Sequence, residues 1–230
     1  MMNNLKEIEF LNEDYFIHAR DNMVLHQLIP FGVKNPALLR AFSDVPREVF
    51  LDVNQKQTAY ADTLIPLNFH GIMLPPHFLG RLLEEAPLDS QGKAMVIGVG
   101  SGYASAILSS LMSLVFLLES HKVLALKEEE TMKDLGLDNI FVIEGPLTEG
   151  VKDQGVFDLI LIEGAITHVP SDIFDQLSPT GVLLTFINRG PSVKEATCFR
   201  KQKCGWRSTV LFEANVPILH AFETSNVFSF

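Results

Sequence analysis

Residues 94–103 read AMVIGVGSGY, and this stretch decides the fold. An apolar run at 94–97 is followed by alternating glycines at 98, 100 and 102, and then by apolar residues at helical spacing as far as residue 112. A strand, a glycine turn and a helix in this order are typical of the opening unit of a doubly wound α/β sheet, whose ligands sit at the carboxyl ends of the strands. Glycine lets the backbone turn sharply and lets a ligand approach it closely. We therefore expect a ligand over residues 98–102; the alternative is a tight turn that binds nothing.

An acid at the end of the next expected strand favours a nucleoside as that ligand. Residues 114–118 read LVFLL, an apolar run typical of a buried parallel strand, and Glu119 follows it, 17 residues after Gly102. A carboxylate about 20 residues past such a turn can accept hydrogen bonds from both ribose hydroxyls. The spacing is G-x-G-x-G rather than the G-x-G-x-x-G of dinucleotide binders, and no lysine follows as in a P-loop. For Glu119, the alternative is a solvated acid at a strand end.

The composition of the chain favours a single domain and argues against nucleic acid as a partner. The chain has 230 residues, of which 47% are hydrophobic, enough for one well-packed core. The formal net charge is −10, and the sequence holds no run of Lys and Arg of the kind that non-specific nucleic-acid binding requires. We therefore expect no nucleic-acid partner.

The cysteines and the apolar stretches indicate a cytoplasmic protein. Cys198 and Cys204 are the only two cysteines, and their spacing fits neither a zinc site nor a secreted disulfide framework. The first residues, MMNNLKEIEF, lack the apolar segment of a signal peptide. The longest apolar stretch, at 104–118, is broken by serines and is too short to span a bilayer. We expect a cytoplasmic protein without a membrane contact or a bound metal.

After residue 94 the pattern alternates between strands and helices. We expect strands at 94–98, 114–118, 139–143, 157–162 and 181–187 and helices at 102–112, 121–135 and 170–177. This alternation predicts a parallel sheet with helices on both faces. Earlier helices are expected at 5–29, at 78–85 and from Pro36 to about 42, with Asn35 as the cap. The tail, residues 208–230, looks β-rich, with TVLFEANV and NVFSF as strand candidates.

Dispersed segments in a fixed order give the chain a resemblance to a known family. They are RDNMVLHQLIPFGV at 20–33, LRAFSDVPREVF at 39–50, AYAD at 59–62, IPL at 65–67, VIGVGSGY at 96–103, FDLILIEGA at 157–165 and VPSDIFDQLSPTGVLL at 169–184. Together they resemble the protein-L-isoaspartate O-methyltransferase family, which uses S-adenosylmethionine. The EGPL run at 144–147 and the tail at 217–230 resemble a divergent bacterial branch of that family.

The resemblance implies an α/β fold, a doubly wound Rossmann-like methyltransferase sheet with an N-terminal helical segment and a β-rich C-terminal tail. One methyltransferase-like domain would cover residues 1–230, with helices and the active-site loop at 1–77, the cofactor-binding core at 78–190 and the tail at 191–230. The cofactor-binding residues it implies are Gly98, Val99, Gly100, Ser101, Gly102 and Tyr103, Glu119 for the ribose, and Gly145, Pro146 and Leu147 beside the adenine. The product left in this site would be S-adenosylhomocysteine.

Several positions depart from the family pattern. Ile72, Met73 and Leu74 stand where the active-site loop carries a Thr-Ile-Ser run, so an alkyl group replaces a hydroxyl that positions the reacting carboxylate. Val96 stands where the first strand usually carries an acid, and Pro146 replaces an acid near the adenine. Methyl transfer survives such losses in principle, because the sulfonium is already activated and an ionised carboxylate needs no general base. We assign no catalytic residue from the sequence.

Two functions stay open at this point. The first is an S-adenosylmethionine-dependent O-methyltransferase that transfers a methyl group to a carboxylate of a protein or peptide, as in protein repair. The second is a degenerate, non-catalytic family member that binds the nucleoside or a protein partner. The changed loop, Val96 and Pro146 favour the second function, and the retained glycines and Glu119 favour the first. The sequence indicates neither the true methyl acceptor nor the oligomeric state.

Three histidines lie near the expected site. His70 and His77 flank the changed loop, and His168 follows the carboxyl end of an expected strand. One interpretation is a catalytic base or a substrate contact, and the other is a loop histidine with a structural partner. Trp206, the only tryptophan, is expected to cover a hydrophobic edge.

Overall fold

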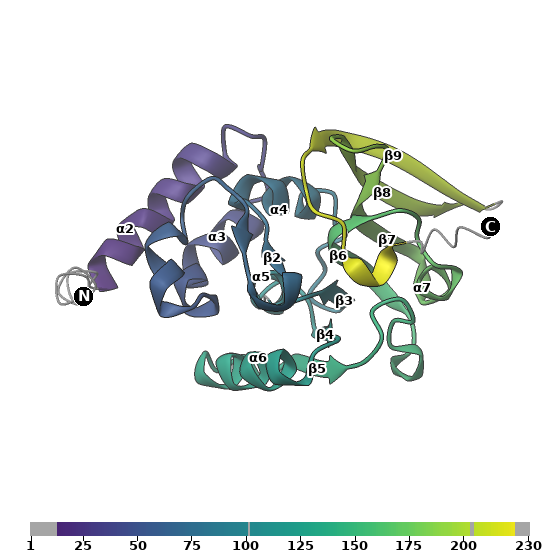
Figure 1. Ribbon diagram of the computed structural model, residues 1–230, viewed down its shortest axis with the longest axis horizontal. Coiled ribbons are helices and arrows are strands. Elements are labelled where there is room, and N and C mark those ends of the chain that lie inside the picture. The colour runs from purple at the N-terminus through teal and green to yellow at the C-terminus, as the bar shows by residue number, and fades with distance from the viewer. Residues whose placement is uncertain (1–12, 101, 203–204, 224–230) are drawn as a thin grey trace, which may run out of the picture.

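A mixed sheet of seven strands forms the centre of the described part of the chain (Figure 1). The computed structural model describes residues 13–100, 102–202 and 205–223. The strand order is β5-β4-β3-β6-β7-β8-β9, parallel from β5 to β7 and antiparallel from β7 to β9. These strands are β3 (Lys93–Gly98), β4 (Leu114–Glu119), β5 (Ile140–Glu144), β6 (Phe157–Ile166), β7 (Leu177–Asn188), β8 (Lys194–Gln202) and β9 (Gly205–Ala214). A separate antiparallel pair joins β1 (Ile65–Pro66) to β2 (Ile72–Met73).

The helices confirm the expected alternation, with shifted ends. They are α2 (Glu13–Met23), continued by η1 (Val24–Leu28), then α3 (Pro36–Asp44), α4 (Pro76–Leu83), α5 (Tyr103–Ser109), α6 (Lys122–Asp134) and α7 (Ser171–Asp175). Short 3₁₀ turns are η2 (Arg47–Phe50), η3 (Val53–Thr58), η4 (Asn68–His70), η5 (Lys152–Gln154) and η6 (His220–Phe222). The expected helix at 170–177 was wrong at its end, because Leu177 already pairs with Phe157 in the sheet. Residues 5–12 of the first expected helix lie outside the described residues.

The strand order places a topological switch point at β3. The chain runs outward from β3 through β4 to β5, and then returns to β6 on the other side of β3. In open α/β sheets, the crevice at the carboxyl ends of the strands beside such a reversal is where ligands bind. The ends of β3, β4 and β6 therefore define where a site is to be sought.

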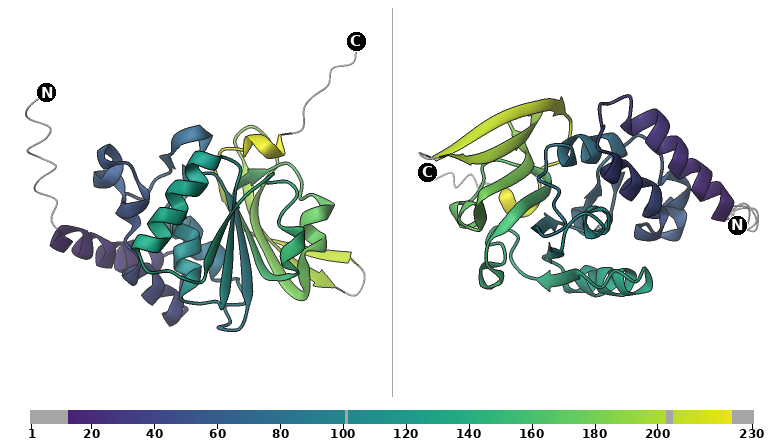
Figure 2. Two further views of the ribbon diagram at one scale, coloured as in Figure 1. Left: turned by 90° about the horizontal axis from the view of Figure 1, so that it is seen from below. Right: turned by 180° about the vertical axis from the view of Figure 1, so that it is seen from behind.

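Both faces of the sheet are covered, as Figure 2 shows. Successive residues of β3 point to opposite faces, so Val96 belongs to the core cluster that includes residues of α3, α4 and α5, while Met95 and Ile97 belong to the cluster that includes residues of α7 and η6. All three of these side chains are fully buried. The apolar Val96, at a position where the family pattern has an acid, thus belongs to the hydrophobic core.

The C-terminal part forms a hairpin of β8 and β9 at one edge of the sheet. The sequence predicted strand structure at 209–216, and β9 covers it as far as Ala214, whereas β8 was not predicted. The second candidate, residues 226–230, lies outside the described residues. Trp206 stacks on Phe174 of α7, with 4.5 Å between ring centroids, and so covers an apolar edge as expected.

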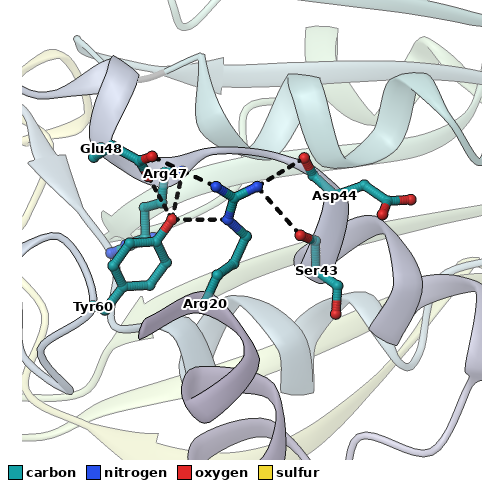
Figure 3. Close-up of polar contacts among 6 residues, drawn as sticks. All are labelled: Arg20, Ser43, Asp44, Arg47, Glu48 and Tyr60. Carbon is teal, nitrogen blue, oxygen red and sulfur yellow. Dashed lines mark hydrogen bonds and ion pairs between the residues drawn. The ribbon is translucent and has the colours of Figure 1, made fainter. Parts of the chain in front are cut away.

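The N-terminal helices are tied to the segment that follows them by Arg20 (Figure 3). Its guanidinium donates to the Tyr60 hydroxyl at 3.1 Å and to the carbonyls of Ser43 and Asp44 at 3.3 and 3.1 Å. It also forms an ion pair of 3.5 Å with Glu48, which accepts from Tyr60. This network holds η2, and with it Arg47, against the rest of the domain.

Asn35 caps α3 as predicted. Its side-chain oxygen accepts from the backbone N–H groups of Ala37 and Leu38, and Pro36 occupies the first turn. The cap satisfies donors that a helix start otherwise leaves without partners, which fixes where α3 begins.

Candidate active site

The glycine turn lies at the carboxyl end of β3, beside the switch point. Gly98 ends the strand and Gly102 precedes α5. Gly100 has a φ of 85°, a left-handed conformation that residues with a side chain rarely adopt, so this position requires glycine. Ser101 lies outside the described residues. The turn is thus built as the sequence predicts, at the edge where a ligand would bind.

Glu119 ends β4 next to this turn, and its carboxylate is already occupied. One oxygen accepts from the Gly100 N–H at 2.8 Å, and the other accepts from the His121 N–H at 2.7 Å. The side chain is fully buried. In this arrangement Glu119 ties the glycine turn to the end of β4, and its role toward ribose hydroxyls stays a prediction.

A cavity of about 100 Å³ lies on the β4 and β5 side of the turn. Its lining on the side of the sheet consists of Val99, Ser120, His121 and Leu147. Leu147 is buried, whereas Pro146 is exposed and does not line the cavity. The Gly145 N–H donates to the Glu119 carbonyl at 2.9 Å. The cavity therefore joins the end of the glycine turn to the two segments expected to contact ribose and base.

Two segments close this cavity. The first is residues 67–71, here called the covering loop, which contributes Phe69 and His70 to the lining. The second is the start of η6 with the residue before it, which contributes Leu219, His220 and Ala221. The Phe69 ring lies 4.7 Å from that of His121, and the His70 ring lies 4.7 Å from that of His220. Because these rings reach across the cavity from both sides, a ligand larger than the cavity requires the covering loop or η6 to move.

The covering loop touches the glycine turn directly. A Cβ placed on Gly71 would lie 2.1 Å from the Val99 carbonyl oxygen, so the two backbones are in contact. Phe69 and His70 have φ angles of 54° and 62°, in the left-handed region that disfavours side chains. The loop thus reaches the turn through two backbone conformations that are unfavourable by themselves.

The changed positions after this loop are buried and held through their backbone. Ile72 and Met73 form β2, and Leu74 is fully buried. The Arg47 guanidinium donates to the carbonyls of Leu74 and Ala59, each at 2.6 Å. The Leu74 N–H hydrogen bonds to Glu163. A buried cation and a buried acid therefore fix the peptide of the residue that replaces the family hydroxyl.

Arg47 is the largest of the fully buried side chains in the described residues. Its guanidinium carbon lies 4.8 Å from the centroid of the Tyr103 ring. Burial lowers the pKa of Arg47, while Tyr103 and Glu163 act in the opposite direction. Burial likewise raises the pKa of Tyr103 to about 12. The Tyr103 side chain packs in the core against Phe42 of α3 and Phe50 of η2 rather than in the cavity, and its cofactor role stays a prediction.

Two buried acids, Glu163 and Glu128, interact with groups of this region. Glu163, near the end of β6, has its pKa raised to about 8 by burial, against the attraction of Arg47 and the Leu74 hydrogen bond. Glu128 of α6 has its pKa raised well above its ordinary value by burial and by repulsion from Glu119 and Glu163. One oxygen of Glu163 and both oxygens of Glu128 are buried without a hydrogen-bond partner. Acids with raised pKa values at the ligand edge of a sheet are candidates for a functional role.

Arg47, Glu128 and Glu163 were not predicted as site residues, although each carries a signal. Glu163 directly follows the apolar run LILI, the same pattern that identified Glu119. Glu128 falls on the stripe of α6 that buries Leu124 and Met132, so helical spacing places it inward. Arg47 follows a proline and has no local signal, because its partners come from residues 59 and 74.

The histidines have structural partners. His77 pairs with Asp62, and His168 contacts Thr167 through Nδ1.

Within the described ranges, no group of three or more His, Cys, Asp or Glu side chains could hold a metal ion. No helix in the described part of the chain combines the length and apolar character needed to cross a membrane.

Comparison with known sequences gives a family match over most of the chain. The model of the protein-L-isoaspartate(D-aspartate) O-methyltransferase family matches residues 19–215. A protein-L-isoaspartate O-methyltransferase of Pseudomonas fluorescens is 31% identical over 202 residues, which are 86% of this chain and 94% of that protein. One from Koribacter versatilis is 32% identical over 205 residues, 89% of this chain and 92% of that protein.

Solved structures agree in fold. A protein-L-isoaspartate O-methyltransferase superposes with a TM-score of 0.77 at 22% identity, covering 87% of this chain and 65% of that longer one. A Plasmodium falciparum protein of the same description, in complex with S-adenosyl-L-homocysteine, superposes with a TM-score of 0.73 at 22% identity, covering 86% of this chain and 97% of that one. The expected sheet and its helical cover are confirmed by these neighbours.

Proposed function

The chain belongs to the protein-L-isoaspartate(D-aspartate) O-methyltransferase family, and from this premise we propose that it methylates a carboxylate of a damaged aspartyl residue in a protein or peptide. The family makes it an S-adenosylmethionine-dependent enzyme. The single observation that carries the proposal is the glycine turn at the switch point, with Glu119 at the end of the adjacent strand and the cavity beside both.

The residues at this edge fit the nucleoside in kind. Val99, Ser120, His121 and Leu147 already line a cavity at the carboxyl ends of the strands, with apolar surface on the side expected for the base. The cavity volume of about 100 Å³ is smaller than the roughly 300–1,000 Å³ of usual small-molecule sites. We therefore propose that the glycine turn, Glu119 and Leu147, together with Ser120 and His121, hold the nucleoside once the covering loop or η6 has moved.

The chemistry then requires alignment more than acid or base catalysis. When bound, S-adenosylmethionine supplies an activated methyl group that passes from its sulfur to a carboxylate oxygen, leaving S-adenosylhomocysteine and a methyl ester. The chain's own residues have to orient that carboxylate and keep water out. The buried surroundings of Leu74 and Glu163 suit both tasks.

The experiment has a binding arm and a transfer arm. Isothermal titration with S-adenosylhomocysteine is expected to show one site, with Glu119→Gln as the weakened variant and the exposed Glu129→Gln as the matched control. Methyl transfer to an isoaspartyl hexapeptide is then compared with transfer to its aspartyl counterpart, with base-labile methyl ester as the readout. Absence of nucleoside binding would overturn the proposal. Binding without transfer to any carboxylate would identify the non-catalytic alternative, which the family match does not favour.

A role in protein repair and a place in the cytoplasm complete the proposal. Methyl esterification of a damaged aspartyl residue is the step that the relatives' names assign to those proteins. Cys198 is a buried free thiol, and such a thiol suits a reducing compartment.

A further inference from the structure

The two sides of the switch point carry different chemistry. The cavity expected for the nucleoside lies toward β4 and β5, where Ser120, His121 and Leu147 line it. On the other side of β3 stands β6, and the two strands pair from Ala94 with Leu159 to Ile97 with Ile162. Under the proposed function, a donor whose nucleoside lay on the first side would have β6 on the other side of β3 for its reacting end.

Glu163 is the residue of β6 that follows the last pair with β3, three residues before the strand ends at Ile166. A Cβ placed on Gly98 would lie 3.4 Å from the Glu163 Cβ, so this side chain stands directly against the first glycine of the turn. Glu163 is only 2% exposed, and its Oε1 is buried without a hydrogen-bond partner. Such an orphaned oxygen costs free energy in the empty protein and is satisfied when a ligand group pairs with it.

We propose that Glu163 is the acceptor-binding residue, whose free oxygen hydrogen bonds to the carboxylate that receives the methyl group. The inference rests on the proposed function, since it needs a carboxylate acceptor. Leu74 has no hydroxyl with which to hydrogen bond to the acceptor. Glu163, which hydrogen bonds to the Leu74 N–H, would supply this hydrogen bond instead.

A carboxyl group contacts a carboxylate favourably only when it carries the proton. Burial raises the pKa of Glu163 to about 8, so the group is neutral and can donate at pH 7. The charged and titratable groups around it are Arg47 of η2 and Glu128 of α6, with Tyr103 of α5 beside Arg47. Burial disfavours the ionised form of Glu163, whereas Arg47 and the Leu74 N–H favour it.

The consequence is an acceptor affinity that falls on the alkaline side. An isoaspartyl carboxylate is ionised throughout the range from pH 6.5 to 9, so Glu163 is the group that changes charge. Above its pKa, two carboxylates would face each other and repel. A side-chain amide at position 163 keeps a donor but does not titrate in this range.

The test measures binding rather than turnover. The protein, saturated with S-adenosylhomocysteine, is titrated by calorimetry with an isoaspartyl hexapeptide at pH 6.5, 7.5 and 9.0. Because about a tenth of a group with a pKa of about 8 is protonated at pH 9, the affinity of the wild type is expected to fall about tenfold. Glu163→Gln is expected to change less than twofold over the range, and Glu163→Leu is expected to bind at least tenfold more weakly at pH 6.5.

The controls separate this inference from the proposed function. The exposed Glu129→Gln is expected to follow the wild type, and a hexapeptide with its acceptor carboxylate amidated is expected to show no alkaline fall. An equal fall in Glu163→Gln and wild type, an unchanged affinity in Glu163→Leu, or no peptide binding at any pH despite nucleoside binding would overturn the role of Glu163. Failure of the wild type to bind S-adenosylhomocysteine would instead overturn the proposed function. If the variants do not fold, the wild-type profile with the two peptides still decides the question.

Discussion

Glu163 makes the stability of the folded protein fall as the pH rises. Its pKa is raised from the ordinary value of 4.5 to about 8 by burial. Between these two values the unfolded chain has released the proton and the folded chain still holds it, so each rise in pH favours unfolding. The contribution is therefore fully present below pH 4.5 and is lost as the pH rises to about 8.

The magnitude follows from the size of this window. A difference of one bound proton corresponds to about 1.4 kcal/mol per pH unit. At pH 8 Glu163 is about half protonated in the folded state, so the loss per pH unit becomes smaller near that pH. From pH 6 to pH 8 the unfolding free energy of wild type therefore falls by about 2–3 kcal/mol through Glu163 alone. Glu163→Gln removes the titrating group while keeping the shape and an acceptor for the Leu74 N–H, so this loss is absent from the variant.

Urea unfolding followed by circular dichroism at pH 6, 7 and 8 measures the effect. The difference in unfolding free energy between Glu163→Gln and wild type is expected to grow in favour of the variant by about 2–3 kcal/mol across this range. Glu130→Gln, an exposed acid with the same change of charge, should run parallel to wild type. Parallel curves for all three proteins would show that Glu163 ionises normally in the folded state, and the electrostatic reasoning would be refuted.

Three further predictions concern the cofactor and acceptor. Glu119→Ala should weaken S-adenosylhomocysteine binding by about 1.5–3 kcal/mol, the range for a hydrogen bond to a charged group; unchanged affinity by calorimetry would remove Glu119 from the ribose. Leu74→Ser should raise transfer to an isoaspartyl peptide by at most about tenfold, because one hydrogen bond contributes about 0.5–1.5 kcal/mol and Ile72 remains changed; recovery of a hundredfold or more in initial rates would contradict this. If the segment around the exposed Pro146 has the family's backbone conformation, Pro146→Asp should tighten binding of S-adenosylhomocysteine. Wild type should discriminate poorly between adenine and hypoxanthine nucleosides; strong adenine preference in competition titrations would mean that another group contacts the amino group.

Much of the fold could be predicted because its signals are local. The apolar runs that became β3, β4 and β6 are short, continuous and followed by a glycine or an acid, which is the pattern of a strand buried on both faces. The strand β8 was not predicted because its sequence, KEATCFRKQ, mixes charged and small residues. It is ordered by pairing with β7 and β9 on either side. Here tertiary pairing outweighs local preference.

The site was predictable only in part, for a related reason. Glycines and an acid at fixed spacing predicted the turn and Glu119, because both depend on short-range geometry. The link between Arg47, Leu74 and Glu163 joins residues up to 116 positions apart, and only the folded chain brings them together. The two hydrogen bonds from the Gly100 and His121 N–H groups to the Glu119 carboxylate could not be predicted from the sequence either, because they depend on the backbone conformation of the turn.

The covering loop is held in its closed position at the cost of two unfavourable backbone conformations, at Phe69 and His70. Each left-handed residue other than glycine costs about 1–2 kcal/mol, so the closed position carries an unfavourable conformational energy of a few kcal/mol. The ring contacts with His121 and His220 offset this cost, and swinging the loop away releases it. If the nucleoside binds only when the loop has moved away, its apparent affinity is its intrinsic affinity multiplied by the fraction of molecules in which the loop is open. A substitution that relieves the strain at these two positions would therefore change the apparent cofactor affinity through the loop equilibrium as well as through any direct contact.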